Sequence, residues 1–181
     1  PDLVFQQGAL AFLKKDYSLA QKLFREAARR ASETTAENAL FNENLAALNA
    51  NDASGAAALI KEAAGSSRLR ESILFEQAHY AAKRMAPQAA ELLANFITLA
   101  ETPTLKTQAR LDQVEVALNL NPPDLETVQA ILPLLEKEQL SPEQTMQLAR
   151  LNILEEESRQ EWPSAIQSCR RAIALDSEGK Q

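Results

Sequence analysis

The sequence predicts an all-α fold, built as a continuous array of about five antiparallel helical hairpins. Strong helix formers dominate its 181 residues, which include only four glycines. No run alternates apolar and polar residues in strand fashion over six or more positions. A pattern of small and large residues recurs at intervals in the mid-thirties, as an array of helical hairpins requires.

The recurring pattern is clearest in the first unit, "GALAFLKKDYSLAQKLFREA". The small residue Gly8 is followed by a second small residue, Ala20, and then by the large residue Phe24. The second small residue recurs at positions 56, 89 and 165, at intervals of 36, 33 and 76 residues. The longest interval leaves room for one degenerate unit over residues 103–140. Because two closely packed helices need small side chains where their backbones approach, we expect Ala20 and Ala56 to be buried.

Turn-forming stretches within and between the units divide the chain into ten predicted helices. We expect Asp52 to cap one helix and Pro122 or Pro123 to open another. "TTAE" (34–37) and "SPEQ" (141–144) predict capping boxes. The predicted hairpins cover residues 1–32, 34–65, 67–101, 103–139 and 141–176. The predicted helices cover residues 2–15, 18–31, 34–49, 53–64, 67–84, 87–100, 104–119, 123–138, 142–159 and 162–175.

These features resemble the tetratricopeptide repeat (TPR) family, whose motif is matched in the first unit by Gly8, Tyr17, Ala20, Phe24 and Ala27. The last unit, "WPSAIQSCRRAIALDS", is similar to the family's second helix, with Trp162 in the slot of Tyr17. The resemblance implies a right-handed superhelix over residues 1–181, part of a longer chain. It also implies that first helices line a concave face that binds a partner's peptide. The family's usual role is that of an adaptor or scaffold without chemistry of its own.

Composition argues against several classes of partner. The formal net charge of −6 disfavours nucleic acid, whose phosphates call for a basic surface. No apolar run approaches the roughly 20 residues of a membrane span. The single cysteine, Cys169, excludes an internal disulfide and a multi-cysteine metal site. The sequence leaves the cytoplasm and the bacterial periplasm open as compartments, and its Ala-, Gln-, Glu- and Leu-rich style favours a bacterial source.

Residues suited to catalysis are scarce, so we expect no enzyme activity and no cofactor or metal. The only histidine, His79, lies in the middle of a predicted helix, as a surface or partly packed imidazole would. Cys169 occupies a core slot of its helix, where a buried inert thiol is expected. No glycine-rich phosphate loop is present. The adjacent carboxylates of "LEEES" point in different directions on a helix.

A row of asparagines in the second unit is the strongest signal for binding. Asn38, Asn42, Leu45 and Asn49 are spaced to share one helical face, although asparagine is a poor helix former. An asparagine amide can donate to and accept from a peptide backbone at once, provided that Asn42 has no internal partner. Alternatively, these residues cap loops, bond within the fold or face water. Phe41 would add an apolar wall.

Neighbouring units would extend this face with Phe5 and Phe12 from the first unit and Leu74 from the third. Alternatively, the two aromatic residues pack against the next hairpin. One subtype of the resembled family grips chaperone tails by their terminal carboxylate, but among the matching slots only Asn42 fits. We therefore expect a neutral to apolar protein or peptide segment as partner. The predicted partner-binding residues are Phe5, Phe12, Asn38, Phe41, Asn42, Leu45, Asn49 and Leu74.

The last predicted helix raises a rival interpretation. We expect Trp162 to be largely buried at its turn, and the apolar helix behind it to be covered by a further segment or a second copy. A solenoid needs a polar terminal surface, and only "DSEGKQ" follows. The chain could therefore be a structural spacer or self-association module without a peptide ligand. An enzyme hidden in a helical fold is the second rival.

Overall fold

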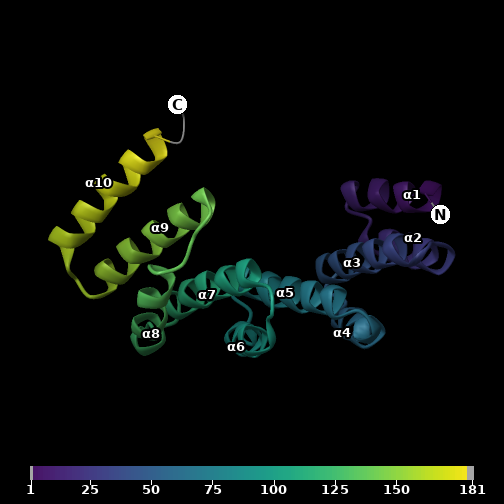
Figure 1. The fold of residues 1–181 in the computed structure, drawn as a ribbon, viewed down its shortest axis with the longest axis horizontal. Helices are drawn as coiled ribbons and strands as arrows, with labels where there is room; N and C mark the ends of the chain where they lie inside the picture. The colour runs from purple at the N-terminus through teal and green to yellow at the C-terminus, as the bar shows by residue number, and fades with distance from the viewer. Residues whose placement is uncertain (1, 179–181) are drawn as a thin grey trace. The chain divides into compact units, whose positions relative to one another are not determined.

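The computed structural model describes residues 2–178, and their side chains as far as residue 174. These residues form ten α-helices and one short 3-10 helix, without a strand (Figure 1). The predicted all-α fold and its ten helices are therefore confirmed for this part of the chain. The helices are α1 (Asp2–Leu13), α2 (Tyr17–Arg30), α3 (Glu33–Asn49), α4 (Ala53–Glu62), α5 (Ser67–Lys83), α6 (Ala89–Leu99), α7 (Pro103–Leu118), α8 (Leu125–Leu135), α9 (Pro142–Ser158) and α10 (Trp162–Glu178), with η1 (Ala63–Gly65) after α4.

Two of the predicted caps are confirmed. The Asp52 carboxylate accepts a hydrogen bond from the Gly55 backbone N–H at 2.9 Å and so caps α4. Ser141 and Gln144 form a complete capping box at the start of α9. Each bond satisfies an N–H group that the first turn of a helix leaves without an intrahelical acceptor.

Two other predicted helix starts are wrong. Helix α3 begins at Glu33, and its N-cap residue Ser32 makes no side-chain capping bond, so "TTAE" lies inside the helix. Helix α8 begins at Leu125, beyond both prolines of "NPPD". Its cap is Asp124, whose carboxylate accepts the Thr127 N–H at 3.1 Å. A carboxylate that can accept from the first turn fixes the start more firmly than a favourable proline does.

The helices form two compact units, Pro1–Tyr80 and Ala81–Gln181, with the division inside α5. In the first unit, α2 packs against both α1 and α3, and α3 packs against α4. In the second unit, each helix from α6 to α10 packs against the next, and α7 also contacts α9. Helices thus pack consecutively along the chain within each unit.

The first core explains the spacing seen in the sequence. Gly8, Ala20 and Phe24 are all buried, and Phe24 is among the largest fully buried side chains. A Cβ atom at Gly8 would lie only 2.9 Å from Cδ1 of Phe24, so the glycine makes room for the phenyl ring. The predicted burial of Ala20 and Ala56 is confirmed, since they are 0% and 4% exposed.

The second unit is held together by an aliphatic core shared among α7, α8 and α9. Leucine and valine dominate it, and four of its members have no exposed surface, namely Leu111, Val114, Val128 and Leu135. The complete set of buried members is Leu111, Val114, Ala117, Val128, Leu132, Leu135, Leu148 and Leu151.

Side-chain hydrogen bonds between helices repeat at nearly the interval seen in the sequence. The Gln77 amide donates to Asn44 over 33 positions, at 2.9 Å. Equivalent bonds join residues 31 or 32 positions apart in both units. They join Gln21 to Asp52, Arg68 to Glu37, Lys83 to Glu115, and Thr107 to Glu138. This regularity fits a helical repeat.

Trp162 contradicts the prediction that it is buried, because 57% of its surface is exposed. Its counterpart Tyr17 packs edge to face on Phe12, with ring centroids 5.3 Å apart. The residue at the same spacing before Trp162 is the exposed Glu157, which offers no apolar surface. Cys169 is half-buried, so it is less enclosed than the core slot predicted for it.

Candidate functional site

The predicted asparagine row lies on α3, with Asn38 exposed and Asn42 and Asn49 half-buried. The Asn42 amide nitrogen donates to the Asn38 carbonyl at 2.7 Å, and Asn49 donates to the Leu45 carbonyl at 2.8 Å. The hypothesis that the Asn42 amide has no hydrogen-bond partner within the protein is therefore wrong. The cause is local, because a short amide side chain in a helix reaches the carbonyl four residues earlier. Oδ1 and the second amide hydrogen are the groups of Asn42 left for a ligand.

A cleft of about 300 Å³ lies where the N-terminal halves of α3 and α5 meet, hereafter the α3/α5 cleft. It brings together two of the predicted binding residues, Asn38 and Phe41. Phe41 and Leu69 also belong to the apolar cluster around Leu59 and Ile73, so the core holds this part of the lining in place. The full lining is Glu37, Asn38, Phe41, Arg68, Leu69 and Ser72.

The polar part of this cleft carries both hydrogen-bond donors and hydrogen-bond acceptors. Arg68 and Glu37 form an ion pair across it at 3.4 Å, and the Arg68 side chain is 77% exposed. Such exposed pairs contribute little to stability, so a ligand can replace one partner at low cost. The Ser72 hydroxyl donates to the Arg68 carbonyl at 3.0 Å, and its oxygen can still accept a hydrogen bond.

The predicted aromatic residues of the first unit are engaged in packing. Phe5 stacks edge to face on the buried Phe24, with ring centroids 5.3 Å apart, and Phe12 makes the equivalent contact with Tyr17. Both phenyl rings are half-buried against the first core. Their contacts match the packing alternative, and neither residue lines the α3/α5 cleft. Two further predicted residues, Leu45 and Leu74, are half-buried and also lie outside its lining.

A buried ion-pair network joins α2, α3 and α4 in the same unit. Glu43 is only 5% exposed, and its Oε1 accepts from Nε of Arg25 at 2.8 Å. Arg25 also pairs with Glu62. Burial raises the pKa of Glu43 even though the Arg25 charge opposes the shift. Glu43 Oε2 is buried without a hydrogen-bond partner. Arg25 thus links two carboxylates across three helices, which indicates a structural role.

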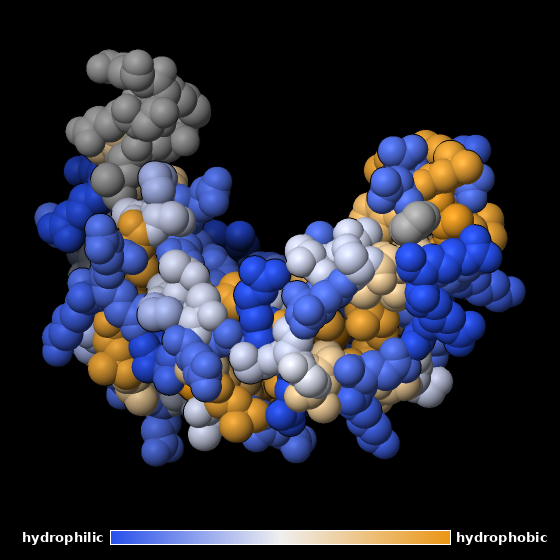
Figure 2. All heavy atoms as spheres, turned by 45° about the vertical axis from the view of Figure 1, so that its right-hand side comes forward, coloured by the Kyte–Doolittle hydropathy of each residue, from blue (hydrophilic) through white to orange (hydrophobic). Residues whose placement is uncertain are grey.

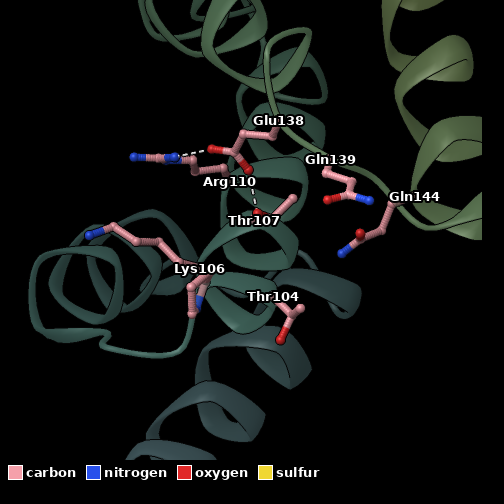
Figure 3. Close-up of a pocket in the computed structure, with 8 residues that line it drawn as sticks. Thr104, Lys106, Thr107, Arg110, Glu138, Gln139 and Gln144 are labelled. Carbon is pink, nitrogen blue, oxygen red and sulfur yellow. Dashed lines mark hydrogen bonds and ion pairs between the residues drawn. The ribbon is translucent and has the colours of Figure 1, made fainter.

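A second cleft, of about 430 Å³, lies in the second unit (Figure 3). Glu138 lies at its centre, paired with Arg110 and accepting a hydrogen bond from the Thr107 hydroxyl. Lys106 also contributes to the lining, so cationic side chains outnumber anionic ones. The sequence does not indicate this cleft, because the repeat pattern is degenerate over these residues. The spacing of Thr107 and Arg110 in "TLKTQAR", one helical turn apart, was the available signal.

Next to it, a row of polar side chains connects α7 and α9. The Gln108 amide donates to Gln147 at 2.9 Å, and Gln147 donates in turn to Glu115 at 3.4 Å. Lys83 donates to the same Glu115 carboxylate at 3.2 Å. Because these groups bond to one another, the row joins helices more than it offers free groups to a ligand.

His79 is half-buried and stacks on Phe75, with ring centroids 5.4 Å apart, as expected for a partly packed imidazole. Within residues 2–178, no three side chains of the metal-ligating types come together. The same residues contain no helix long and apolar enough to cross a bilayer.

No family model, curated protein or solved structure matches the chain. The resemblance to tetratricopeptide repeats therefore depends on the motif residues and on the helical-repeat packing.

Proposed function

We propose that the chain is a non-catalytic protein–protein interaction module, in which an extended segment of a partner protein binds in the α3/α5 cleft. The module would be a right-handed TPR-like solenoid of antiparallel hairpins. The observation that carries this proposal is the lining of the cleft, where core-anchored apolar residues adjoin an exposed amide, a hydroxyl and an ion pair.

The chemistry of that lining suits a peptide. Phe41 and Leu69 offer apolar surface to one side chain of the ligand, and burial of that side chain would supply most of the binding free energy. The Asn38 amide can donate to a backbone carbonyl and accept from a backbone N–H. A volume near 300 Å³ is at the low end for ligand pockets, which fits one side chain with its flanking backbone.

The charge of the lining favours a neutral partner segment. Glu37 and Arg68 neutralise each other, and the other lining residues carry no charge. A strongly acidic or basic ligand would therefore find no net opposite charge in this lining. The proposed ligand is therefore an extended segment with one large apolar side chain and uncharged neighbours.

A displayed peptide library would test the proposal. Peptides selected on the wild-type protein are expected to lose about fivefold in affinity for Asn38→Ala, because one hydrogen bond contributes about 1 kcal/mol. Asn95→Ala, the same change at an exposed position of α6 in the other unit, is the matched control and should bind as wild type does. Selected peptides that bind Asn38→Ala and Arg68→Ala as tightly as wild type would exclude this cleft.

The rival interpretation, a spacer or self-association module, is favoured by a different observation. Exposed apolar side chains follow one face of α1 and one face of α10. A library that yields no peptide at all would favour this rival.

A further inference from the structure

Helix α10 exposes a stripe of large apolar side chains. Trp162, Ile166 and Ile173 are 57%, 56% and 69% exposed. Their spacings of four and seven residues place them on one face of the helix, since four and seven residues are close to one and two turns. The stripe thus extends over about three turns, and the half-buried Cys169 lies within it.

Helix α1 exposes a similar stripe. Leu3, Leu10 and Leu13 are 68%, 57% and 77% exposed. Phe5 and Phe12, which pack into the core, point away from this side of the helix. Figure 2 shows apolar residues gathered on the surface at α1, at the upper right of the view.

We propose that these two stripes bind each other between copies of the chain, with α10 of one copy packed antiparallel on α1 of the next. The spacings match in that orientation. Aligning Ile166 with Leu10 brings Ile173 opposite Leu3 and Trp162 within one residue of Leu13. Large apolar residues then meet at three successive levels of the helix pair, with the small Cys169 side chain between two of them.

The charges near the stripes select the antiparallel orientation. Helix α1 has Asp2 at its start and Lys14 and Lys15 just after its end. Helix α10 follows Glu161, and the exposed Arg170 is its middle residue. In the antiparallel arrangement Lys14 and Lys15 meet the oppositely charged Glu161. A parallel arrangement would instead bring Asp2 beside Glu161, and placing like charges together is unfavourable. The helix dipoles favour the same choice.

Association of this kind is heterologous, because the two contacting surfaces differ. After one such contact, each of the two chains still offers one stripe, so further copies can add until a ring closes. One helix on one helix buries less than the roughly 1,200 Å² of a standard interface, so we expect weak association, detectable near about 1 mM protein. The contact does not involve the α3/α5 cleft, and Asn38→Ala should leave it unchanged.

Sedimentation velocity on the intact chain, with two single variants, tests the proposal. Wild type should show species larger than the monomer as its concentration rises. Leu10→Glu and Ile166→Glu should each remain monomeric, because each variant has lost one of the two stripes. Leu99→Glu, at an equally exposed leucine of α6, is the matched control and should associate as wild type does. Circular dichroism would verify that each variant keeps its helices.

Mixing the two variants is the decisive measurement. Leu10→Glu retains an intact α10 stripe, and Ile166→Glu retains an intact α1 stripe, so an equimolar mixture should form a heterodimer that grows no further. A symmetric contact between two α10 helices would instead leave Leu10→Glu able to dimerise alone. Either that result, a mixture that stays monomeric, or a wild type that stays monomeric near 1 mM would overturn the proposal.

Discussion

The contact between Gly8 and Phe24 is the tightest test of the first core at the level of single residues. Gly8→Ala would gain about 1 kcal/mol of helix propensity, because glycine is a poor helix former. The new Cβ would lie 2.9 Å from the ring of Phe24, which is 1% exposed and packs edge to face on Phe5, so the ring would have to shift against its neighbours. Overpacking costs roughly 1–3 kcal/mol, so we expect a net loss of unfolding free energy in urea denaturation.

A second substitution separates these two effects. Phe24→Leu removes ring atoms from the contact, so that Gly8→Ala added to this background should be neutral or stabilising. The double-mutant cycle then yields a favourable coupling between the two positions. If Gly8→Ala costs the same in both backgrounds, the ring contact is not the source of the loss.

Glu43 allows a prediction about pH. Burial raises its pKa in the folded protein above the ordinary value of 4.5, so the folded state binds a proton more tightly than the unfolded state does. Glu43 therefore favours folding most below that ordinary value, and its contribution falls as pH rises through the raised pKa. Glu43→Gln cannot titrate. The unfolding free energy of wild type should fall relative to Glu43→Gln as the pH rises from about 4.5 towards neutrality.

The comparison with the variant removes the titration of the other carboxyl groups. It is measured by urea denaturation at a series of pH values, with the difference between the two proteins as the readout. A pH-independent difference would mean that Glu43 has the same pKa in both states.

At the level of elements, Asp52 connects α4 to α2. Its carboxylate caps α4 through Gly55 and also accepts from the Gln21 amide at 3.1 Å. Asp52→Ala should lower the unfolding free energy by about 1 kcal/mol, the usual cost of a lost N-cap. Asp52→Asn is the matched control, since asparagine caps helices nearly as well, and it should retain most of the stability. Thermal melts of the three proteins would measure these losses. Equal losses for both variants would mean that the charge of Asp52, and not its capping bond, stabilises the fold.

These elements can be predicted from the sequence because each depends on residues close together in the chain. Caps such as Asp52 and Ser141 depend on a few neighbouring residues, and the buried small residues follow from the repeated spacing. The predicted burial of Trp162 is wrong because it depends on a neighbouring side chain of α9. That neighbour is Glu157, whereas Tyr17 in the first unit packs on Phe12. The start of α8 was misjudged because a proline and a carboxylate gave competing local signals.

Only part of the lining of the α3/α5 cleft could likewise be predicted from the sequence. Asn38 and Phe41 were found from the periodicity of one helix, whereas Arg68, Leu69 and Ser72 come from the next first helix. Predicting that the two groups of residues line one cleft requires the register between α3 and α5. The periodicity within one helix does not contain that register. In the structure that register brings the Arg68 side chain within 3.4 Å of Glu37, 31 positions earlier in the chain.

For the whole molecule, consecutive packing predicts that damage stays local. Leu135 has no exposed surface and lies in the core shared by α7, α8 and α9. Leu135→Ala should cost roughly 2–5 kcal/mol, through lost burial and the cavity left behind. In a repeat array each element is stabilised mainly by its neighbours, so this loss should remain in the second unit. Amide hydrogen exchange of the variant should accelerate in α7–α9 and stay unchanged in α1–α3. Equal acceleration in α1–α3 would mean that both units unfold as one cooperative domain, contrary to nearest-neighbour stabilisation.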